Sequence, residues 1–306
     1  MFKKMHAVAQ QVNQVVIGKE QQVKLALACL LANGHLLIED VPGVGKTTLA
    51  HALALSLGLQ FNRVQFTSDL LPADVAGIAI FERATGAFVF HPGPIFTQVL
   101  LADEINRATP KTQSGLLEAM EERQVTSEGA TRALPAPFFV IATQNPGHQV
   151  GTFPLPESQL DRFLMCLSLG YPDAAAERAL LMGDDRRSML KQLSAAMQPE
   201  ELAAAQQGLR QIHAAPALVD YVQALAQASR HNGLFAEGLS PRAAIALLRA
   251  ARAWAALEGR DHVLPEDVQA VLVPVCAHRL RPLKSANGTA LASRDLVLQL
   301  QKSVPL

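Results

Sequence analysis

A lysine followed by two threonines stands between a glycine-containing turn and a run of helix-favouring residues. In HLLIEDVPGVGKTTLA the turn and the helix start comprise Gly43, Val44, Gly45, Lys46, Thr47 and Thr48. Backbone N–H groups at a helix N-terminus bind phosphate oxygens, and glycines let them approach without a Cβ clash. The pattern predicts a phosphate-binding loop, in which Lys46 neutralises β- and γ-phosphate oxygens and the Thr47 hydroxyl binds Mg²⁺.

The loop departs from the general form G-x-x-x-x-G-K-[ST] at its first position, where this chain has Asp40. Position 40 precedes the amides that wrap the phosphate, so we expect Asp40 to alter the turn more than the phosphate contacts. The alternative is a chance strand, turn and helix carrying the letters GKTT.

Two adjacent carboxylates end the apolar strand Val-Leu-Leu-Ala that precedes Asp103 and Glu104. Acids at the end of a buried strand are costly unless their charge meets a partner, and Mg·ATP would be such a partner. We expect Asp103 to hold the Mg²⁺ shell, through water, and Glu104 to polarise the attacking water as general base. A strand that ends at an exposed acidic turn is the alternative.

Two further polar residues follow apolar or short helical segments. Asn145 ends the strand FFVIATQ and could hydrogen-bond the water or the γ-phosphate, although an asparagine before Pro146-Gly147 is also an ordinary turn residue. Arg162 suits an arginine finger, because its guanidinium forks onto phosphate oxygens. A structural ion pair with Asp161 or Glu157 is the competing interpretation.

Arg242 lies in the first turn of an expected helix that starts with Ser240 and Pro241. A cation there opposes the helix dipole by about 0.3–1 kcal/mol. This position therefore suggests a nearby anion, such as a nucleotide phosphate held by the other domain. The alternative is an arginine side chain that extends into solvent.

The chain that carries these residues has two regions with different sequence patterns. Up to Tyr171-Pro172, short apolar strands alternate with helices, which predicts an α/β fold with a parallel sheet flanked by helices. The expected strands are 35–38, 61–65, 99–102, 138–143 and 165–169, and the expected helices are 20–33, 47–57 and 112–122. Hairpins are expected over 78–90, around Ala84-Thr85-Gly86, and over 124–133, around Glu128-Gly129.

The later sequence is rich in Ala and Leu and predicts an all-α lid domain. Its expected helix starts are marked by Pro199, Pro216, Pro241 and Pro265. We expect a core over 1–171, with inserts near 74–95 and 123–137, a lid over 172–281 and a tail over 282–306. The charged stretch 183–193 is expected to be a solvated connection, and one short helix is expected near 294–302.

Composition limits the possible classes of protein. Lys+Arg and Asp+Glu both number 27, a balance that argues against a protein whose main task is to bind nucleic acid. The three cysteines are far apart and predict neither a metal site nor disulfides. Because the chain has no signal peptide and no apolar run of membrane-spanning length, we expect no membrane association and a cytoplasmic location.

With these residues considered together, the chain resembles a MoxR-family AAA+ ATPase of the helix-2-insert clade. The similar stretches run in order from about residue 15 to 281 and include LLIEDVPGVGKTTLA, VQFTSDLLPADVAG, LLADEINRATPKTQSGLLEAMEERQVT, LPESQLDRFLM and GLSPRAAIALLRAARAWAALEGRDHV. The stretch LLADEINRATPKTQSGLLEAMEERQVT is far more specific than a phosphate-binding loop alone. Asp40 also fits the form that the loop has in this family.

The resemblance implies roles for individual residues. Val16, Ile17 and Gly18 would line the adenine pocket of bound ATP, with the nucleotide between core and lid. Asn145 becomes sensor 1, Arg162 the finger that reaches a neighbour's γ-phosphate, and Arg242 sensor 2 on the lid.

The resemblance also implies partners. Family members form rings, usually hexameric, and act as chaperone-like factors that mature or activate protein complexes, often with von Willebrand factor A domain proteins. This chain has no such domain, so a partner of that kind would be a separate protein. A nucleotide-gated binding scaffold with slow hydrolysis and, less favoured, a nucleic-acid translocase are the alternatives.

Overall fold

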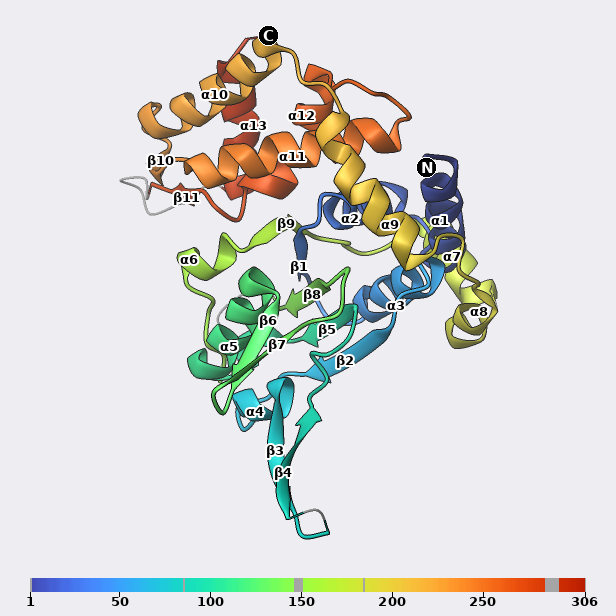
Figure 1. The fold of residues 1–306 in the computed structure, drawn as a ribbon. Coiled ribbons are helices and arrows are strands. Elements are labelled where there is room, and N and C mark those ends of the chain that lie inside the picture. Colours follow the sequence, from blue (N-terminus) through green and yellow to red (C-terminus); the bar gives the residue numbers. More distant parts are fainter. Residues whose placement is uncertain (1, 85, 146–150, 184, 284–291, 306) are drawn as a thin grey trace.

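The computed structural model describes residues 2–84, 86–145, 151–183, 185–283 and 292–305. Thr85 in the first expected hairpin, Pro146-Gly147 after Asn145 and residues 284–291 of the expected tail lie outside the described residues. A parallel α/β core carries a projecting hairpin at one end and a helical domain at the other (Figure 1).

Five parallel strands form the central sheet, in the order β2-β5-β8-β1-β9. They are β1 (His35–Glu39), β2 (Phe61–Gln65), β5 (Val99–Asp103), β8 (Phe139–Gln144) and β9 (Phe163–Leu167). All five expected strands are confirmed, although β9 begins two residues before the expected 165, because Phe163 and Leu164 are themselves buried. The central strands are buried on both faces, as parallel strands covered by helices are.

Helices cover both faces of the sheet. One core cluster joins the sheet to α1 (Phe2–Val15), α2 (Glu20–Leu31) and α3 (Lys46–Ser56). The other joins it to α4 (Pro72–Ala76), the turn η1 (Ile105–Arg107) and α5 (Pro110–Glu122). The expected helices 20–33, 47–57 and 112–122 are confirmed within two residues at each end, whereas α1 and α4 were not expected.

Both expected hairpins are present. The first pairs β3 (Gly77–Glu82) with β4 (Ala87–Pro92) and extends well beyond the sheet (Figure 1). The second pairs β6 (Gln124–Ser127) with β7 (Ala130–Ala133) and follows α5 directly.

The helical second half starts beside the core. α7 (Ala174–Met182) and α8 (Arg186–Gln192) lie near α1 and α3 (Figure 1). The next helix, α9 (Pro199–Gly208), packs against α2. The expectation of a solvated connection over 183–193 was wrong, because α8 occupies it and Leu190 and Leu193 pack on the core. The charged side chains of this stretch had concealed its apolar positions.

The remaining elements form the lid. They are η2 (Leu209–Gln211), α10 (Pro216–His231), β10 (Phe235–Glu237), α11 (Pro241–Leu257), α12 (Pro265–Cys276), β11 (Arg281–Pro282) and α13 (Ser293–Ser303). The four proline-marked helix starts and the helix near 294–302 are confirmed. The short antiparallel pair β10–β11 adds a small strand element that was not expected.

The lid is joined to one side of the core, with α11 against α2 and α12 against β9. The small helix α6 (Glu157–Leu160) precedes β9 near this junction. No helix in the described part of the chain is both long enough and apolar enough to cross a bilayer.

Candidate nucleotide-binding site

The turn between β1 and α3 has the backbone geometry of an anion-binding loop. Gly43 and Gly45 adopt φ of 85° and 95°, a left-handed conformation that strains residues with a Cβ. An added Cβ at either glycine would meet no described protein atom within 4 Å, so space beside the loop is free. Val44 packs partly against the core, whereas the half-buried Thr47 and Thr48 lie in the first turn of α3.

The N-terminus of α3 is free to receive an anion. No side chain caps this helix, and its first turn contains no acidic residue. Four N–H groups at a helix start lack an intrahelical partner, and the helix dipole places partial positive charge there. The loop therefore fits a phosphate group.

Lys46 is buried, and its hydrogen bonds go to two carbonyl groups and one amide oxygen. Its Nζ donates to the carbonyl of Asp40 at 2.6 Å, to that of Val41 at 3.3 Å and to Asn145 Oδ1 at 3.3 Å. Burial lowers the pKa of Lys46, and the charges of Asp40, Asp103 and Glu104 oppose that shift. Lys46 forms no ion pair within the described chain, which suits a lysine that neutralises a phosphate.

Asp40 explains how this loop departs from the general pattern. Its carboxylate accepts hydrogen bonds from the N–H groups of Val41 and Gly170 and from Ser168 Oγ. Burial raises the pKa of Asp40, but these hydrogen bonds more than offset burial and hold it below its usual value. Asp40 thus fastens the start of the loop to the segment that follows β9, as expected of a residue that alters the turn.

The acidic strand end lies next to the loop, because β5, β8 and β1 are neighbours in the sheet. Asp103 is buried, and Thr143 Oγ1 donates to its Oδ1 at 2.6 Å. The same Thr143 oxygen accepts the backbone N–H of Glu104 at 2.9 Å. Glu104 adopts a left-handed φ of 55°, which is uncommon for a residue other than glycine and is found at functional sites.

Asn145 links the loop to the acids. Its Oδ1 accepts from Lys46 Nζ, and its Nδ2 donates to Glu104 Oε1 at 3.4 Å. Four of the residues expected from the sequence, Lys46, Asp103, Glu104 and Asn145, therefore meet at the carboxyl edge of the sheet. A carboxylate and a hydroxyl in this position also fit Mg²⁺, a cation that prefers oxygen ligands.

The segment expected to line the adenine pocket lies beside the start of α7. Val16 is buried, Ile17 is half-buried, and a Cβ on Gly18 would be only 2.7 Å from the Cβ of Ala176. Lys19 Nζ donates to the carbonyl of Tyr171 at 2.8 Å, which fixes the segment to the chain after β9.

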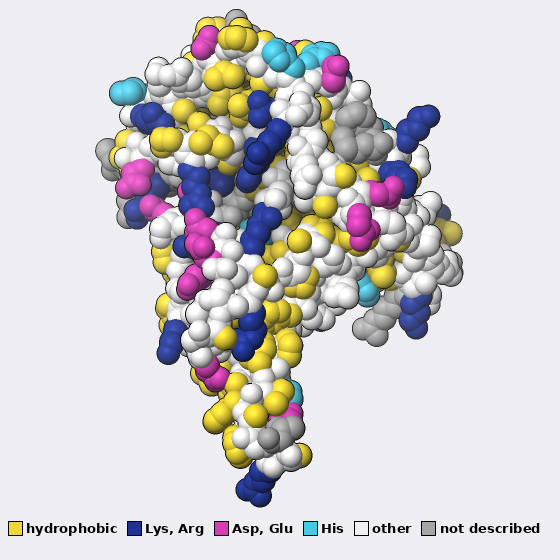
Figure 2. Space-filling view, in the orientation of Figure 1, with side chains coloured by type: hydrophobic (Ala, Val, Ile, Leu, Met, Phe, Trp, Pro, Cys, Tyr) yellow, Lys and Arg dark blue, Asp and Glu magenta, His cyan; other side chains and the backbone are white. Residues whose placement is uncertain are grey.

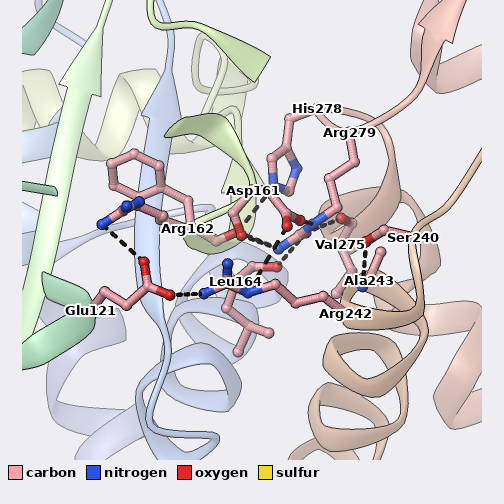
Figure 3. Close-up of polar contacts among 11 residues, drawn as sticks. Glu121, Asp161, Arg162, Leu164, Ser240, Arg242, Ala243, Val275, His278 and Arg279 are labelled. Carbon is pink, nitrogen blue, oxygen red and sulfur yellow. Dashed lines mark hydrogen bonds and ion pairs between the residues drawn. The ribbon is translucent and has the colours of Figure 1, made fainter. Parts of the chain in front are cut away.

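Arg162 and Arg242 lie at the opposite edge of the sheet. Arg162 directly precedes β9, whose first residue pairs with His35 at the start of β1. Since β1 has five residues, one strand length, about 17 Å, separates Arg162 from the loop at the other end of β1. Arg162 pairs with Glu121 of α5 at 2.9 Å, and Arg242 pairs with the same Glu121 at 2.7 Å (Figure 3).

The predicted roles of the two arginines at a nucleotide stay predictions, and the structure adds their contacts within one chain. The anion near Arg242 is Glu121, and Arg162 pairs with Glu121 rather than with Asp161 or Glu157. The resemblance implies a nucleotide between core and lid, and that position stays a prediction. Helices α7 to α9 lead to a lid that lies on the β9 side of the core. A cavity of about 780 Å³ lies there, and no residue of the loop 42–48 lines it.

Three residues near the acids were missed from the sequence. Gln65 Nε2 and Arg107 Nη1 each donate to Glu104 Oε2 at 3.0 Å, and Arg63 pairs with Asp103. Arg63 and Gln65 alternate along β2, so both side chains lie on one face at the strand's carboxyl end. That alternation in FNRVQF was a signal that could have identified them.

The loop, the acidic strand end and the strand order define a P-loop ATPase fold with an appended lid. A sequence model described as "ATPase family associated with various cellular activities (AAA)" matches residues 35–165, and one described as "AAA lid domain" matches residues 227–299. A solved structure of a candidate ATPase from Cytophaga hutchinsonii superposes with a TM-score of 0.90 at 34% identity, over 99% of this chain and 95% of the other.

Named relatives narrow the class. The chain is 43% identical to YeaC of Bacillus subtilis over 96% of this chain and 92% of that protein, which is called uncharacterized. It is 41% identical to Chaperone MoxR1 of Mycobacterium tuberculosis, over 88% of this chain and 74% of that protein. Protein MoxR of Paracoccus denitrificans is 37% identical over 88% of this chain and 86% of that protein. The chain belongs to the MoxR family of chaperone-like AAA+ ATPases.

Proposed function

We propose that this protein hydrolyses Mg·ATP and works as a ring oligomer. The observation that carries the proposal is the contact chain from Lys46 through Asn145 to Glu104, which joins a phosphate-binding loop to a candidate general base. Bound Mg²⁺ would neutralise charge on the β- and γ-phosphate oxygens. Thr47 and Asp103 would hold it, the latter through water.

The chain's own residues would perform the remaining steps. Glu104 accepts the proton of the attacking water, while Gln65, Arg107 and Asn145 orient its carboxylate. Lys46 would neutralise oxygens of the β- and γ-phosphates. Val16, Ile17 and Gly18 would contact the adenine.

The position of the arginines supports ring assembly. Arg162 and Arg242 lie a strand length from their own loop, so each would act on the nucleotide of a neighbouring subunit. A head-to-tail contact that brings the amino edge of one sheet to the loop of the next repeats around a closed ring. We expect a hexamer, as the family resemblance implies.

The test of hydrolysis is a comparison of Glu104→Gln with Glu128→Gln. Both glutamates have a left-handed backbone, with φ of 55° and 54°, but Glu128 is exposed at the turn of β6–β7. We expect Glu104→Gln to bind Mg·ATP normally and to hydrolyse it at least about 100-fold more slowly. Normal turnover by Glu104→Gln, or no ATP binding by the unmodified protein, would contradict the proposal.

The proposed biological role is chaperone-like remodelling or maturation of protein complexes with a separate von Willebrand factor A domain protein. The names of the MoxR relatives support the chaperone class. A nucleotide-gated scaffold with slow hydrolysis is the second candidate. Two steps distinguish these candidates. Proteins that stay bound to the ATP-locked Glu104→Gln variant are first isolated and then added to the unmodified protein. A remodelling enzyme should hydrolyse ATP faster with its client, whereas a scaffold should not.

A further inference from the structure

The strongest unassigned feature is a group of charged residues where α5, the start of β9 and the lid meet. Glu121 stands between two arginines from different domains: its Oε2 accepts from Arg162 Nη1, and its Oε1 lies 2.7 Å from Arg242 Nη2 (Figure 3). Asp161 supplies a second, longer contact to Arg242 Nε at 3.9 Å. One carboxylate therefore sets the spacing of both guanidinium groups.

Each arginine has one Nη nitrogen that takes no part in these contacts. Arg162 uses Nη1 for both Glu121 and the carbonyl of Leu117, at 2.9 and 2.6 Å. Among contacts between described residues, Arg162 Nη2 and Arg242 Nη1 make none. The side chains of Arg162 and Arg242 are 29% and 56% exposed, so an approaching molecule can reach them.

The surroundings contain more positive than negative charge. Burial lowers the pKa of Arg249, and the neighbouring charges of Arg123, Arg279 and Arg242 lower it further. Against these arginines and Arg162, the contacts described here include only the carboxylates of Glu121 and Asp161. An additional anion would therefore be attracted to this surface.

The strengths of the contacts leave both arginines able to bind a phosphate. Partly exposed ion pairs such as those of Glu121 contribute only about 0–1 kcal/mol each. A terminal phosphate carries more charge than a carboxylate and has three oxygens for the forked donors of two arginines. Glu121 can thus orient the two guanidinium groups without holding them too strongly to bind such a group.

We propose that Glu121 is a positioning residue that aligns Arg162 of the core and Arg242 of the lid as a two-arginine clamp for one phosphate of the neighbouring subunit's nucleotide. This inference rests on the proposed function. Because one arginine belongs to each domain, closing the clamp on a phosphate also fixes the lid relative to the core. Glu121 itself does not touch the nucleotide.

Glu121→Gln tests the role, because it keeps the size of the side chain and removes its charge. Glu122→Gln is the matched control: it lies one residue further along α5, is exposed, and lines a different cavity beside α4. We expect Glu121→Gln to lower kcat for ATP about tenfold in assemblies. Mg·ATP binding by unassembled subunits should be unchanged, since a subunit's own loop is a strand length from Glu121. Glu122→Gln should match the unmodified protein.

Mixed assemblies separate positioning from folding. Glu121→Gln subunits have an intact loop, and Glu104→Gln subunits have an intact clamp, so mixing the two should restore part of the turnover. Glu121→Gln mixed with Arg162→Ala should restore none, because both lack the same clamp. Turnover by Glu121→Gln within twofold of Glu122→Gln, or equal results from the two mixtures, would overturn the inference. Absence of ATP hydrolysis by the unmodified protein would instead reject the proposed function.

Discussion

Arg63 on β2 holds Asp103 on β5 through two hydrogen bonds to one oxygen, with Nε and Nη2 at 3.1 and 2.7 Å from Oδ2. The two residues come from neighbouring parallel strands, and the other carboxylate oxygen is held by Thr143. Asp103 is therefore fully paired before any cation binds. A bound Mg²⁺ and Arg63 would both interact with the one negative charge of Asp103.

Arg63→Leu should make the folded protein depend more on its ligand. Removal of the guanidinium leaves Asp103 Oδ2 without its partner, and we expect a loss of about 1 kcal/mol in the free energy of unfolding, since Arg63 is half exposed. Mg·ATP should raise the melting temperature of this variant more than that of the unmodified protein. Arg83→Leu, on the exposed part of the β3–β4 hairpin, is the control, and equal shifts in both variants would contradict the prediction.

Arg279 fastens the lid to the strand that Arg162 precedes. Its side chain is 5% exposed and contacts Asp161 Oδ1 at 2.7 Å, the carbonyls of Phe163 and Leu164 and that of Val275 (Figure 3). We expect Arg279→Met to lower the free energy of unfolding in urea by about 3 kcal/mol, because buried acceptors lose their donor.

Arg281→Met provides the matched comparison, since Arg281 is 68% exposed and pairs with Glu157 at 3.1 Å. Its effect should stay below about 1 kcal/mol. Similar losses in the two variants would mean that Arg279 does not fasten the lid.

We expect the buried, neutral side chain of His35 to make the protein less stable in mild acid. Its Nδ1 accepts the N–H of Val140, so the proton is on Nε2, which donates to the carbonyl of Met120. Burial lowers the pKa of His35 to about 4. Below its usual value near 6.5 only the unfolded chain gains a proton, so the free energy of unfolding falls as the pH drops from 6.5 towards 4.

His35→Gln removes this titration and keeps a donor and an acceptor. Between pH 7.5 and pH 5.5 the unmodified protein should lose about 1.4 kcal/mol more stability in urea unfolding than His35→Gln does, because one pH unit of that interval lies below 6.5. His231→Gln, at the exposed end of α10, should behave like the unmodified protein. An unchanged pH dependence in His35→Gln would show that His35 is not responsible.

The β3–β4 hairpin presents apolar side chains to solvent (Figure 2). Ile80 and Phe88 are 49% and 73% exposed, and the rings of Phe81 and Phe88 pack edge-on at 5.4 Å. Exposed apolar groups on a projecting element are typical of protein interaction sites. We expect the double variant Ile80→Ser, Phe88→Ser to keep its ATP turnover and to bind a client retained by the Glu104→Gln variant at least about fivefold more weakly.

Leu181 and Met182 of α7 provide the comparison, because at 82% and 75% exposed they are more exposed than Ile80 and Phe88. Their double replacement by serine should leave client binding unchanged. Equal loss of binding in both double variants would point to general surface apolarity rather than to the hairpin.

The sequence predicted the strands, the hairpins and the loop because each depends on local patterns. The meeting of Lys46 with Glu104 was also predictable, because parallel strands bring their carboxyl ends to one edge. Arg63 and Gln65 were missed although they alternate along β2, because that alternation does not by itself show which residues of another strand end they contact. The anion beside Arg242 was expected, but its identity as Glu121 depends on the route of α7 to α9, which no local pattern records.

The separation of the loop from the arginine pair by the length of a strand has a consequence for counting active sites. If each subunit supplies a loop at one end and a clamp at the other, then an open row of subunits always leaves one loop at its end without a clamp. Closing the row into a circle gives that last loop the clamp of the first subunit, without adding a subunit. An isolated chain, by the same count, has no complete site, and its turnover per subunit should rise with protein concentration.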